Sequence, residues 1–519
     1  MGIPAYFSYI IKNHSKIIKT INSLNEVHNL YMDCNSIIYD AFYSLENKTT
    51  NVHNNITKEV ISKIKHYITK INPTKNIILA FDGVAPVAKL EQQRTRRTRG
   101  QFLNEINSKI KNKENNTWNT NAITPGTEFM QQLGLAITYE FENNNKILVN
   151  FFPPGEGEHK IFEYIRDYPK EHIGYNTIIY GLDADLIMLS INHLPVTNQI
   201  YLFRETPEFI KSLDSSLDPN KLYMIDIPLL THQITLDMNN YKEVTSELQK
   251  NRIYDYIFLC FFLGNDFMPH FPSINIRTNG IDILLDVYRN TIGETDEFLT
   301  DGKKIYWKNV RKIIQKLAEN EENYLKHEHI KRDKSEKRYL PTNTPEEKER
   351  KFNSIPSFDR IYEKFINPFD VGWQERYYKT LFRMKIDETR RQQICQNYIE
   401  ALEWTFKYYS SGCYNWRWKY NYNYAPLLED LIKYIPYFET EFIKKQPKNP
   451  VSAKTQLAYV LPKTSHNLID KTVLNKIHPY IDEWYPENFD FKYAYCKYFW
   501  ESHLDLPEIP IHQLEKLVN

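Results

Sequence analysis

Short apolar runs alternate with helix-like patterns over residues 1–290, and this alternation constrains the fold more than any other feature. The runs are rich in β-branched and aromatic residues, as strands are. Strands that alternate with helices are typical of an α/β protein with a largely parallel sheet. We therefore predict an α/β fold with a mixed, mostly parallel sheet. Its expected strands are Asn29–Met32, Asn76–Phe81, Ile147–Phe152, Thr177–Tyr180 and Gln199–Phe203.

The rest of the chain changes character twice. Residues 291–355 contain a strongly charged stretch, 316–351, with few large apolar side chains. Such a stretch predicts an exposed helix and a mobile connector. Residues 356–519 are rich in aromatic side chains and predict a second, mainly helical lobe. A chain of 519 residues is long enough to bury the cores of two or more lobes.

Composition excludes several classes of protein. The chain has no run of about 18 apolar residues, so we expect no membrane span. Its 15 glycines form no phosphate-binding loop of the Walker or dinucleotide type. The cysteines are scattered singly, which argues against a disulfide framework and a cysteine zinc site and favours a reducing compartment. They are Cys34, Cys260, Cys395, Cys413 and Cys496.

Carboxylate side chains follow the predicted strands repeatedly. In an open α/β sheet, ligands bind at the carboxyl ends of the strands. A single aspartate at such a position typically caps the next helix. Seven carboxylates in separate loops would instead repel one another unless cations neutralised them. The seven are Asp33, Asp82, Glu156, Glu158, Asp183, Asp185 and Asp266.

The chemistry of these ligands predicts the kind of metal. Oxygen ligands without a cysteine or histidine cluster favour Mg²⁺ or Mn²⁺ over Zn²⁺. Two such ions a few ångströms apart would suit hydrolysis of a phosphodiester bond, because they activate water and stabilise the leaving oxygen.

A basic stretch follows Asp82 closely, and Pro86 suits the first turn of a helix. A period of 3.6 residues puts one ammonium, one amide and two guanidinium groups on a common face, which would suit a terminal phosphate. A charge run of this kind is otherwise a solvated helix face, but its closeness to Asp82 favours phosphate binding. The four side chains are Lys89, Gln93, Arg96 and Arg97.

Several blocks of sequence, in their order along the chain, resemble the XRN family of eukaryotic 5′→3′ exoribonucleases, which are relatives of the flap endonucleases. The blocks span nearly the whole chain, and those of the second lobe are not shared with the flap endonucleases. The blocks are MGIP (1–4), DCNSII (33–38), 81–97, ITPGTEFM (123–130), PGEGEHK (154–160), 180–189, LGNDF (263–267), GWQERYYK (372–379), GCYNWRW (412–418) and YAP (424–426).

The resemblance implies a PIN-like catalytic domain over residues 1–290, a charged helical connector over 291–355, and a second conserved region over 356–519 that closes the active site. It implies that the seven carboxylates hold divalent metal ions. It also implies that Lys89, Gln93, Arg96 and Arg97 bind a 5′-phosphate in a pocket too confined for a cap or a triphosphate.

The resemblance further implies that Trp416 stacks near the active site and helps to advance the strand. Stacking on a base contributes about 1–3 kcal/mol and does not depend on sequence. From the residues alone, core packing explains Trp416 equally well.

The sequence departs from the family in four places. Tyr39 stands where the family usually has a histidine that stacks with the tryptophan; a tyrosine can stack but carries no positive charge. Ser36 replaces the usual glycine, and the short segment 100–121 predicts a reduced helical tower. The chain stops soon after residues 504–510, where the second region of the family ends. We therefore expect a compact core enzyme, from a virus or a streamlined eukaryote.

The resulting hypothesis is a processive exoribonuclease of mRNA decay. It would hydrolyse 5′-monophosphorylated single-stranded RNA to nucleoside 5′-monophosphates with two Mg²⁺ or Mn²⁺ ions. We expect a cytoplasmic monomer, in the host cytoplasm if the source is viral, with a decapping enzyme as a candidate partner. Two alternatives stay open: a structure-specific 5′ DNA nuclease and a non-catalytic RNA-binding scaffold. Contacts to the 2′-hydroxyl separate RNA from DNA, and the sequence does not assign them.

Overall fold

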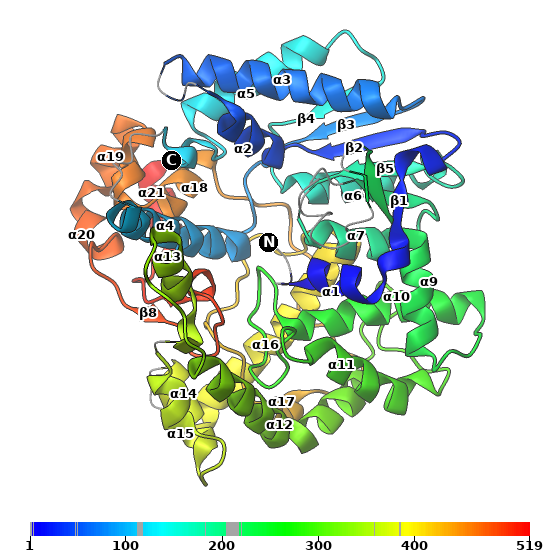
Figure 1. The fold of residues 1–519 in the computed structure, drawn as a ribbon, viewed down its shortest axis with the longest axis vertical. Coiled ribbons are helices and arrows are strands. Elements are labelled where there is room, and N and C mark those ends of the chain that lie inside the picture. Colours follow the sequence, from blue (N-terminus) through cyan, green and yellow to red (C-terminus); the bar gives the residue numbers. More distant parts are fainter. Residues whose placement is uncertain are drawn as a thin grey trace.

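One sheet of seven strands organises the N-terminal part of the protein (Figure 1). The structure is a computed structural model that describes residues 3, 5–46, 48, 50–111, 118–181, 183–203, 217–218, 221–357, 359–382 and 386–519. The sheet order is β1-β7-β6-β5-β2-β3-β4; β6, β5, β2, β3 and β4 run parallel, while β7 pairs antiparallel with β6 and with β1. The strands are β1 (Ile18–Thr20), β2 (Asn29–Asp33), β3 (Ile77–Ala80), β4 (Ile147–Asn150), β5 (Thr177–Tyr180), β6 (Ile200–Phe203) and β7 (Tyr223–Asp226).

The five predicted strands are confirmed, with ends that differ by two residues at most. The sequence does not predict β1 and β7, which add an antiparallel edge to the parallel strands. β1 has three residues, none of them buried, and β7 takes its place through antiparallel pairing with β1 and β6. Pairing between segments that are distant in the sequence leaves no local pattern.

Helices cover both faces of the sheet (Figure 1). Because successive side chains of a strand point to opposite faces, Leu30 and Met32 of β2 join one core and Tyr31 joins the other. The first core includes residues of α2 (Asn35–Ser44), α3 (Val52–Ile71) and α5 (Glu128–Phe141). The second includes residues of α6 (Gly157–Asp167), α7 (Asp185–His193), α9 (Ile227–Met238) and α10 (Ser246–Cys260).

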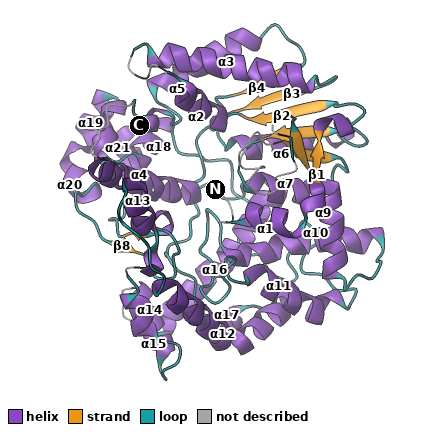
Figure 2. Ribbon diagram, in the orientation of Figure 1, coloured by secondary structure: helices purple, strands orange, loops and turns teal. Residues whose placement is uncertain are grey.

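The C-terminal half is mainly helical and rich in buried aromatic side chains, as predicted (Figure 2). No helix in the described ranges is both long and apolar enough to cross a membrane. The remaining elements are α1 (Tyr6–Asn13), α11 (Gly280–Tyr288), α12 (Trp307–Glu336), α13 (Pro345–Asn353), α14 (Ile361–Ile366), α15 (Trp373–Phe382), α16 (Glu388–Ser411), α17 (Leu428–Tyr434), α18 (Ala453–Val460), α19 (Lys471–Ile477), α20 (Ile481–Trp484), β8 (Phe491–Lys492), β9 (His503–Leu504) and α21 (Ile511–Val518).

The core beside α6 and α7 continues into the helical lobe. It contains Ile187 of α7, Phe258 of α10 and Tyr409 of α16. Phe261 makes an edge-to-face contact with Tyr409, with ring centroids 5.2 Å apart. The two lobes therefore share one packed core across the boundary predicted near residue 290.

The basic helix α4 (Val87–Lys111) begins directly after Pro86, as predicted, and packs against α18. The buried guanidinium group of Arg94 donates to the carbonyl oxygens of Trp484 at 2.9 Å and Pro507 at 2.8 Å. Arg94 thus joins the middle of α4 to the C-terminal segments of the chain.

The charged stretch forms α12 and α13 in part, so its predicted helix is confirmed, but the expected exposure is wrong for one face of α12. Glu321, Glu328 and Arg332 on that face are buried. Arg332 donates from Nε to Oε2 of Glu363 at 2.8 Å and from Nη2 to Oε1 at 2.6 Å, and Arg360 also donates to Glu363. Arg332 and Glu363 form a buried ion pair, and Oε2 of Glu321 accepts the backbone N–H of Glu429 at 3.2 Å. These polar partners allow charged side chains at buried helix positions where a sequence pattern predicts apolar residues.

Replacing Arg332 by methionine should lower the free energy of unfolding by about 3 kcal/mol, because the buried Glu363 carboxylate would lose its bidentate partner. Urea denaturation followed by circular dichroism would measure the loss. Lys316→Met, on the same helix but in an exposed pair with Glu319, should leave the denaturation midpoint near wild type. Equal midpoints for the two variants would contradict this account of α12.

Candidate metal centre

Three predicted carboxylates from separate segments converge at the carboxyl edge of the sheet. Asp33 is the last residue of β2, Asp82 follows β3, and Glu158 lies in the first turn of α6. β2 and β3 are parallel neighbours, so their carboxyl ends meet at the same edge. One carboxylate oxygen from each residue lies within 4.8 Å of the other two.

Backbone and amide donors fix the orientation of Asp82. Its Oδ1 accepts a hydrogen bond from the backbone N–H of Gly157 at 2.8 Å, and its Oδ2 accepts one from Asn35. The backbone N–H of Asp82 donates back to Oδ1 of Asn35 at 3.1 Å. The sequence did not single out Asn35, although it stands only two residues after Asp33 in the same motif.

Lys160 contacts backbone carbonyl groups at the carboxyl ends of β3 and β4. Its buried Nζ donates to the carbonyl oxygen of Phe81 at 2.7 Å and approaches those of Asn150 and Phe151 at 3.4 Å. Burial lowers the pKa of Lys160 to about 8. Sequence reasoning also missed this lysine, whose partners are carbonyl groups of two different strand ends.

Burial and mutual repulsion disfavour the ionised forms of the three carboxylates in the absence of a cation. Burial, followed by the charges of Asp82 and Asp183, raises the pKa of Asp33 well above its ordinary value. Burial and the charge of Glu156 do the same for Glu158. The buried Oδ1 of Asp33 has no hydrogen-bond partner among the described residues. An all-oxygen set with a free buried oxygen fits a hard divalent cation such as Mg²⁺ or Mn²⁺.

Gly157 leaves the space that this arrangement needs. A Cβ atom at position 157 would lie 2.7 Å from Oδ1 of Asp33 and 3.3 Å from the carbonyl oxygen of Ala80. Any side chain at the start of α6 would therefore force the Asp33 carboxylate to turn away.

Lys89 lies between two of the other predicted ligands. Its Nζ is 2.6 Å from Oε1 of Glu156 and 2.7 Å from Oδ2 of Asp266. Burial alone would lower the pKa of Lys89, but Asp266 and Glu156 outweigh it and raise that pKa well above its ordinary value. Burial would raise the pKa of Asp266, but Lys89 together with other positive charges, among them Arg96, outweighs burial and lowers that pKa.

The last two predicted ligands, Asp183 and Asp185, flank the start of α7. Asp185 is buried, which raises its pKa to about 6, and its Oδ1 accepts a hydrogen bond from the hydroxyl of Tyr409 at 2.9 Å. Asp183 is exposed, and its charge contributes to the raised pKa of Asp33. All seven carboxylates thus belong to one electrostatically connected region.

Two tyrosines of α16 contact this region and were not predicted. The hydroxyl of Tyr408 donates to Oε2 of Glu156 at 2.8 Å, beside the contact of Tyr409 with Asp185. Among 38 tyrosines in the sequence, nothing marks these two as site residues.

The predicted phosphate-binding side chains line α4 next to the carboxylates. Arg97 donates to the hydroxyl oxygen of Thr124 at 2.5 Å and to Oδ1 of Asn121 at 3.3 Å. Burial lowers the pKa of Arg97 to about 10, so the group stays charged at neutral pH. Gln93 is buried and its Oε1 has no partner among the described residues, while Arg96 is half-buried.

The two predicted stacking residues lie at the border of the site. Trp416 is 6% exposed, its carbonyl oxygen accepts the backbone N–H of Val87 at 2.9 Å, and Nζ of Lys448 lies 5.6 Å from its ring centroid. Tyr39 of α2 is half-buried, and its electrostatic interaction with Arg97 brings it near the basic face of α4. Base stacking by these two rings stays a prediction.

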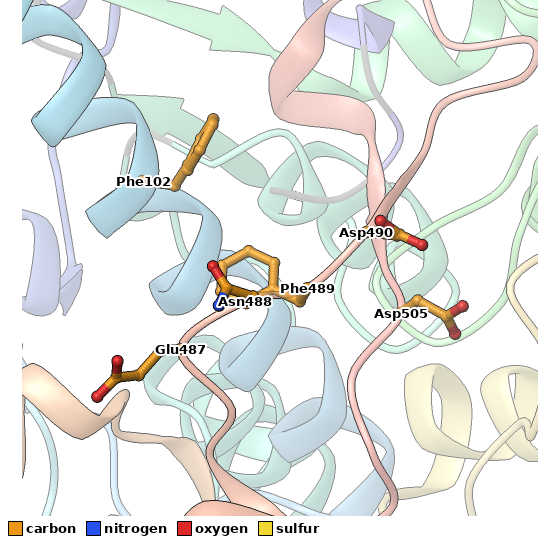
Figure 3. Close-up of a pocket in the computed structure, with 6 residues that line it drawn as sticks. All are labelled: Phe102, Glu487, Asn488, Phe489, Asp490 and Asp505. Atoms are coloured by element: carbon orange, nitrogen blue, oxygen red, sulfur yellow. The ribbon is translucent and has the colours of Figure 1, made fainter.

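Two cavities lie between the middle of α4 and residues 484–490. The cavity in Figure 3 has a volume of about 420 Å³, and its neighbour has about 470 Å³. None of the predicted site residues lines either cavity. The carboxylate cluster is therefore identified by its converging side chains and not by these cavities. The first cavity is lined by Phe102, Glu487, Asn488, Phe489, Asp490 and Asp505.

The fold and the cluster define an α/β protein with an acidic site at the carboxyl edge of a mostly parallel sheet. The sequence model described as "XRN 5'-3' exonuclease N-terminus" matches residues 1–206, and that described as "Xrn1 helical domain" matches residues 248–364 and 362–518. These matches cover well over half of the chain. The protein belongs to the XRN family of 5′→3′ exonucleases.

Curated relatives agree with this family. The chain is 26% identical to 5'-3' exoribonuclease 2 of Arabidopsis thaliana over 98% of its own length and 66% of the relative. It is 27% identical to 5'-3' exoribonuclease 1 of Saccharomyces cerevisiae, over 90% of this chain and 40% of that protein. It is 26% identical to 5'-3' exoribonuclease 2 of Gallus gallus, over 99% of this chain and 69% of that protein. The chain thus spans between 40% and 69% of the length of these relatives.

Among solved structures, the catalytic core of Rad2 in complex with DNA substrate matches with a TM-score of 0.33 and 13% identity, over 79% of this chain and 96% of that one. The flap endonuclease of bacteriophage T5, in a complex with DNA and metal ions, matches with a TM-score of 0.29 and 13% identity. The match covers 58% of this chain and 88% of that one. These scores are too low to carry an argument, and the fold rests on the sheet topology described above.

Replacing Gly157 by alanine should weaken binding of Mn²⁺ by about tenfold or more, because the new methyl group would displace the Asp33 carboxylate. Isothermal titration calorimetry without nucleic acid would measure the affinity. Gly100→Ala, in α4, is the matched control, since its Cβ would meet nothing within 4 Å. Unchanged Mn²⁺ affinity in a folded Gly157→Ala protein would rule out Asp33 as a ligand in this geometry.

Proposed function

We propose that this protein is a divalent-metal-dependent 5′→3′ exoribonuclease that degrades single-stranded RNA carrying a 5′-monophosphate. The observation that carries the proposal is the convergence of Asp33, Asp82 and Glu158, from three segments, on one buried point with an unpaired oxygen. The names of the relatives as 5'-3' exoribonucleases support the choice of RNA and of the direction of attack.

Asp33, Asp82 and Glu158 would hold one divalent cation, with the remaining four carboxylates around them as ligands of a second. When bound, Mg²⁺ or Mn²⁺ supplies an activated water and stabilises the leaving oxygen of the phosphodiester. The chain's own groups orient this chemistry. Asn35 and the N–H of Gly157 hold Asp82, and Lys89 keeps Glu156 and Asp266 together.

The 5′ end of the RNA would be recognised by the face of α4 that carries Gln93, Arg96 and Arg97. Lys89, the fourth residue predicted for this pocket, is paired with Glu156 and Asp266 and would contribute its charge from between these carboxylates. The guanidinium of Arg97, which is charged at neutral pH, would donate to phosphate oxygens next to the carboxylates, and the NH2 group of Gln93 on the same face would be a further donor. Removal of one nucleotide would leave a new 5′-phosphate that enters the same pocket, so a fixed pocket gives stepwise 5′→3′ digestion to nucleoside 5′-monophosphates. Retention of the strand between steps would make this digestion processive. Trp416 and Tyr39 would stack on bases as the strand advances.

The wider role we propose is mRNA decay in the cytoplasm by a monomer, with a decapping enzyme supplying monophosphorylated ends. Decapping would remove the cap that the phosphate pocket excludes and leave the 5′-monophosphate that the pocket accepts.

An end-labelled RNA digest tests the proposal. Wild-type protein with Mg²⁺ or Mn²⁺ should release labelled nucleoside monophosphate from 5′-monophosphate RNA, and little from triphosphate, capped or hydroxyl ends. Asp33→Ala should abolish release while circular dichroism shows a folded protein, because the substitution removes a ligand and little core volume. A matched DNA strand distinguishes a DNA nuclease. Metal-independent release, or a folded Asp33→Ala protein with near wild-type activity, would refute the proposal.

Replacing Arg97 by methionine should reduce the preference for monophosphate over hydroxyl ends by about 10–100-fold, the loss of a charged hydrogen bond of about 1.5–3 kcal/mol. The measurement is the ratio of kcat/KM for the two ends. Arg99→Met is the control: Arg99 lies on the same helix and is more buried than Arg97, but its guanidinium donates to the carbonyl of Ser502, so the ratio should be unchanged. An equal effect of both substitutions would argue against a phosphate pocket at Arg97.

A further inference from the structure

Two consecutive tyrosines near the end of α16 connect the helical lobe to the catalytic carboxylates. Tyr408 donates to Oε2 of Glu156 at 2.8 Å, and Tyr409 donates to Oδ1 of Asp185 at 2.9 Å. Glu156 is the N-cap residue of α6, and Asp185 is the first residue of α7, a different helix of the N-terminal part. A single turn of α16 therefore holds two carboxylates that are far apart in the sequence.

Both tyrosines are buried, at 3% and 2% exposure. A tyrosine hydroxyl, whose ordinary pKa is about 10, is protonated at neutral pH and donates to a carboxylate that it contacts. A neutral donor fixes the direction of a carboxylate without cancelling its negative charge, so the carboxylate still attracts a cation.

Stacked rings lock the side chain of Tyr408 in place. Its ring stacks on His159 with centroids 3.7 Å apart and an interplanar angle of 25°, and on Trp404 at 4.9 Å and 28°. Trp404 stacks in turn on Trp418 at 5.2 Å and 23°. This aromatic column, formed by His159, Tyr408, Trp404 and Trp418, runs from α6 to the loop that follows α16.

The same column reaches the loop that carries Trp416. Nε1 of Trp404 donates to the carbonyl oxygen of Asn415 at 2.8 Å, and the backbone N–H of Trp418 donates to Oδ1 of Asn415 at 3.1 Å. The Trp416 carbonyl accepts the first N–H of α4. The loop, α16 and the carboxylates are thus joined by rigid aromatic packing and hydrogen bonds.

We propose that Tyr408 and Tyr409 are positioning residues that orient Glu156 and Asp185 for metal binding, so that the helical lobe sets the metal affinity of the site. This inference rests on the proposed function and names a contribution to it from outside the N-terminal part. It follows from four contacts: two hydroxyl donors to two carboxylates, and two ring stacks that hold Tyr408 between α6 and α16.

The test uses Tyr408→Phe and Tyr409→Phe, which remove only the hydroxyl groups. Each should weaken Mn²⁺ binding by about tenfold in calorimetry without RNA, as loss of a hydrogen bond to a metal ligand typically does. Raising the Mn²⁺ concentration should restore RNA digestion by both variants, which a purely structural defect would not allow.

Tyr398→Phe is the matched control, because Tyr398 is equally buried in α16 but donates to the backbone carbonyl of Pro269. It should bind Mn²⁺ like the wild type. If the unmodified protein binds Mn²⁺ and digests RNA, and both Tyr408→Phe and Tyr409→Phe bind Mn²⁺ with the same affinity as that protein, this inference alone is overturned. Wild-type protein that neither binds Mn²⁺ nor digests RNA would overturn the proposed function together with it.

Discussion

Carboxylates crowded and desolvated at one edge of a sheet are the interaction on which the rest of this structure depends. Burial and mutual repulsion raise the pKa of Asp33, Asp82 and Glu158, so the ionised forms are costly without compensation. The protein surrounds the acidic groups with donors: the N–H of Gly157, the amide of Asn35, the ammonium of Lys89, and two tyrosine hydroxyls. Oδ1 of Asp33 has no hydrogen-bond partner among the described residues, so it is available as a ligand for a cation.

Helix α4 connects the carboxylate region to the C-terminal segments of the chain. Lys89 and Arg97 face the carboxylates and the segment before α5, whereas Arg94 and Arg99 donate to carbonyl groups of the C-terminal segments. One basic helix therefore serves both the site and the packing of the lobes. A basic run that looks uniform in the sequence is divided by helical periodicity into two sets with different partners.

The predictions succeeded where a local pattern has a single physical consequence. Buried parallel strands need apolar runs, and a residue at the end of such a run must lie at the carboxyl edge, so Asp33 and Asp82 were assigned correctly to that edge. They failed where partners are distant. β7 owes its place to pairing with β1 and β6, and the buried face of α12 is charged because Glu363 and Arg360 are supplied from another segment.

The sequence by itself determined the α/β class, the central strands, the family resemblance and the set of acidic and basic side chains, because each of these follows from residue type and spacing along the chain. Only the tertiary structure decided which of those side chains contact one another. It put Lys89 between Glu156 and Asp266, gave Asp82 its donors, and brought Tyr408 and Tyr409 onto two carboxylates more than 200 positions away. The physical reason is that a hydrogen bond or an ion pair depends on distance in space, and the packing of α16 against α7 sets that distance.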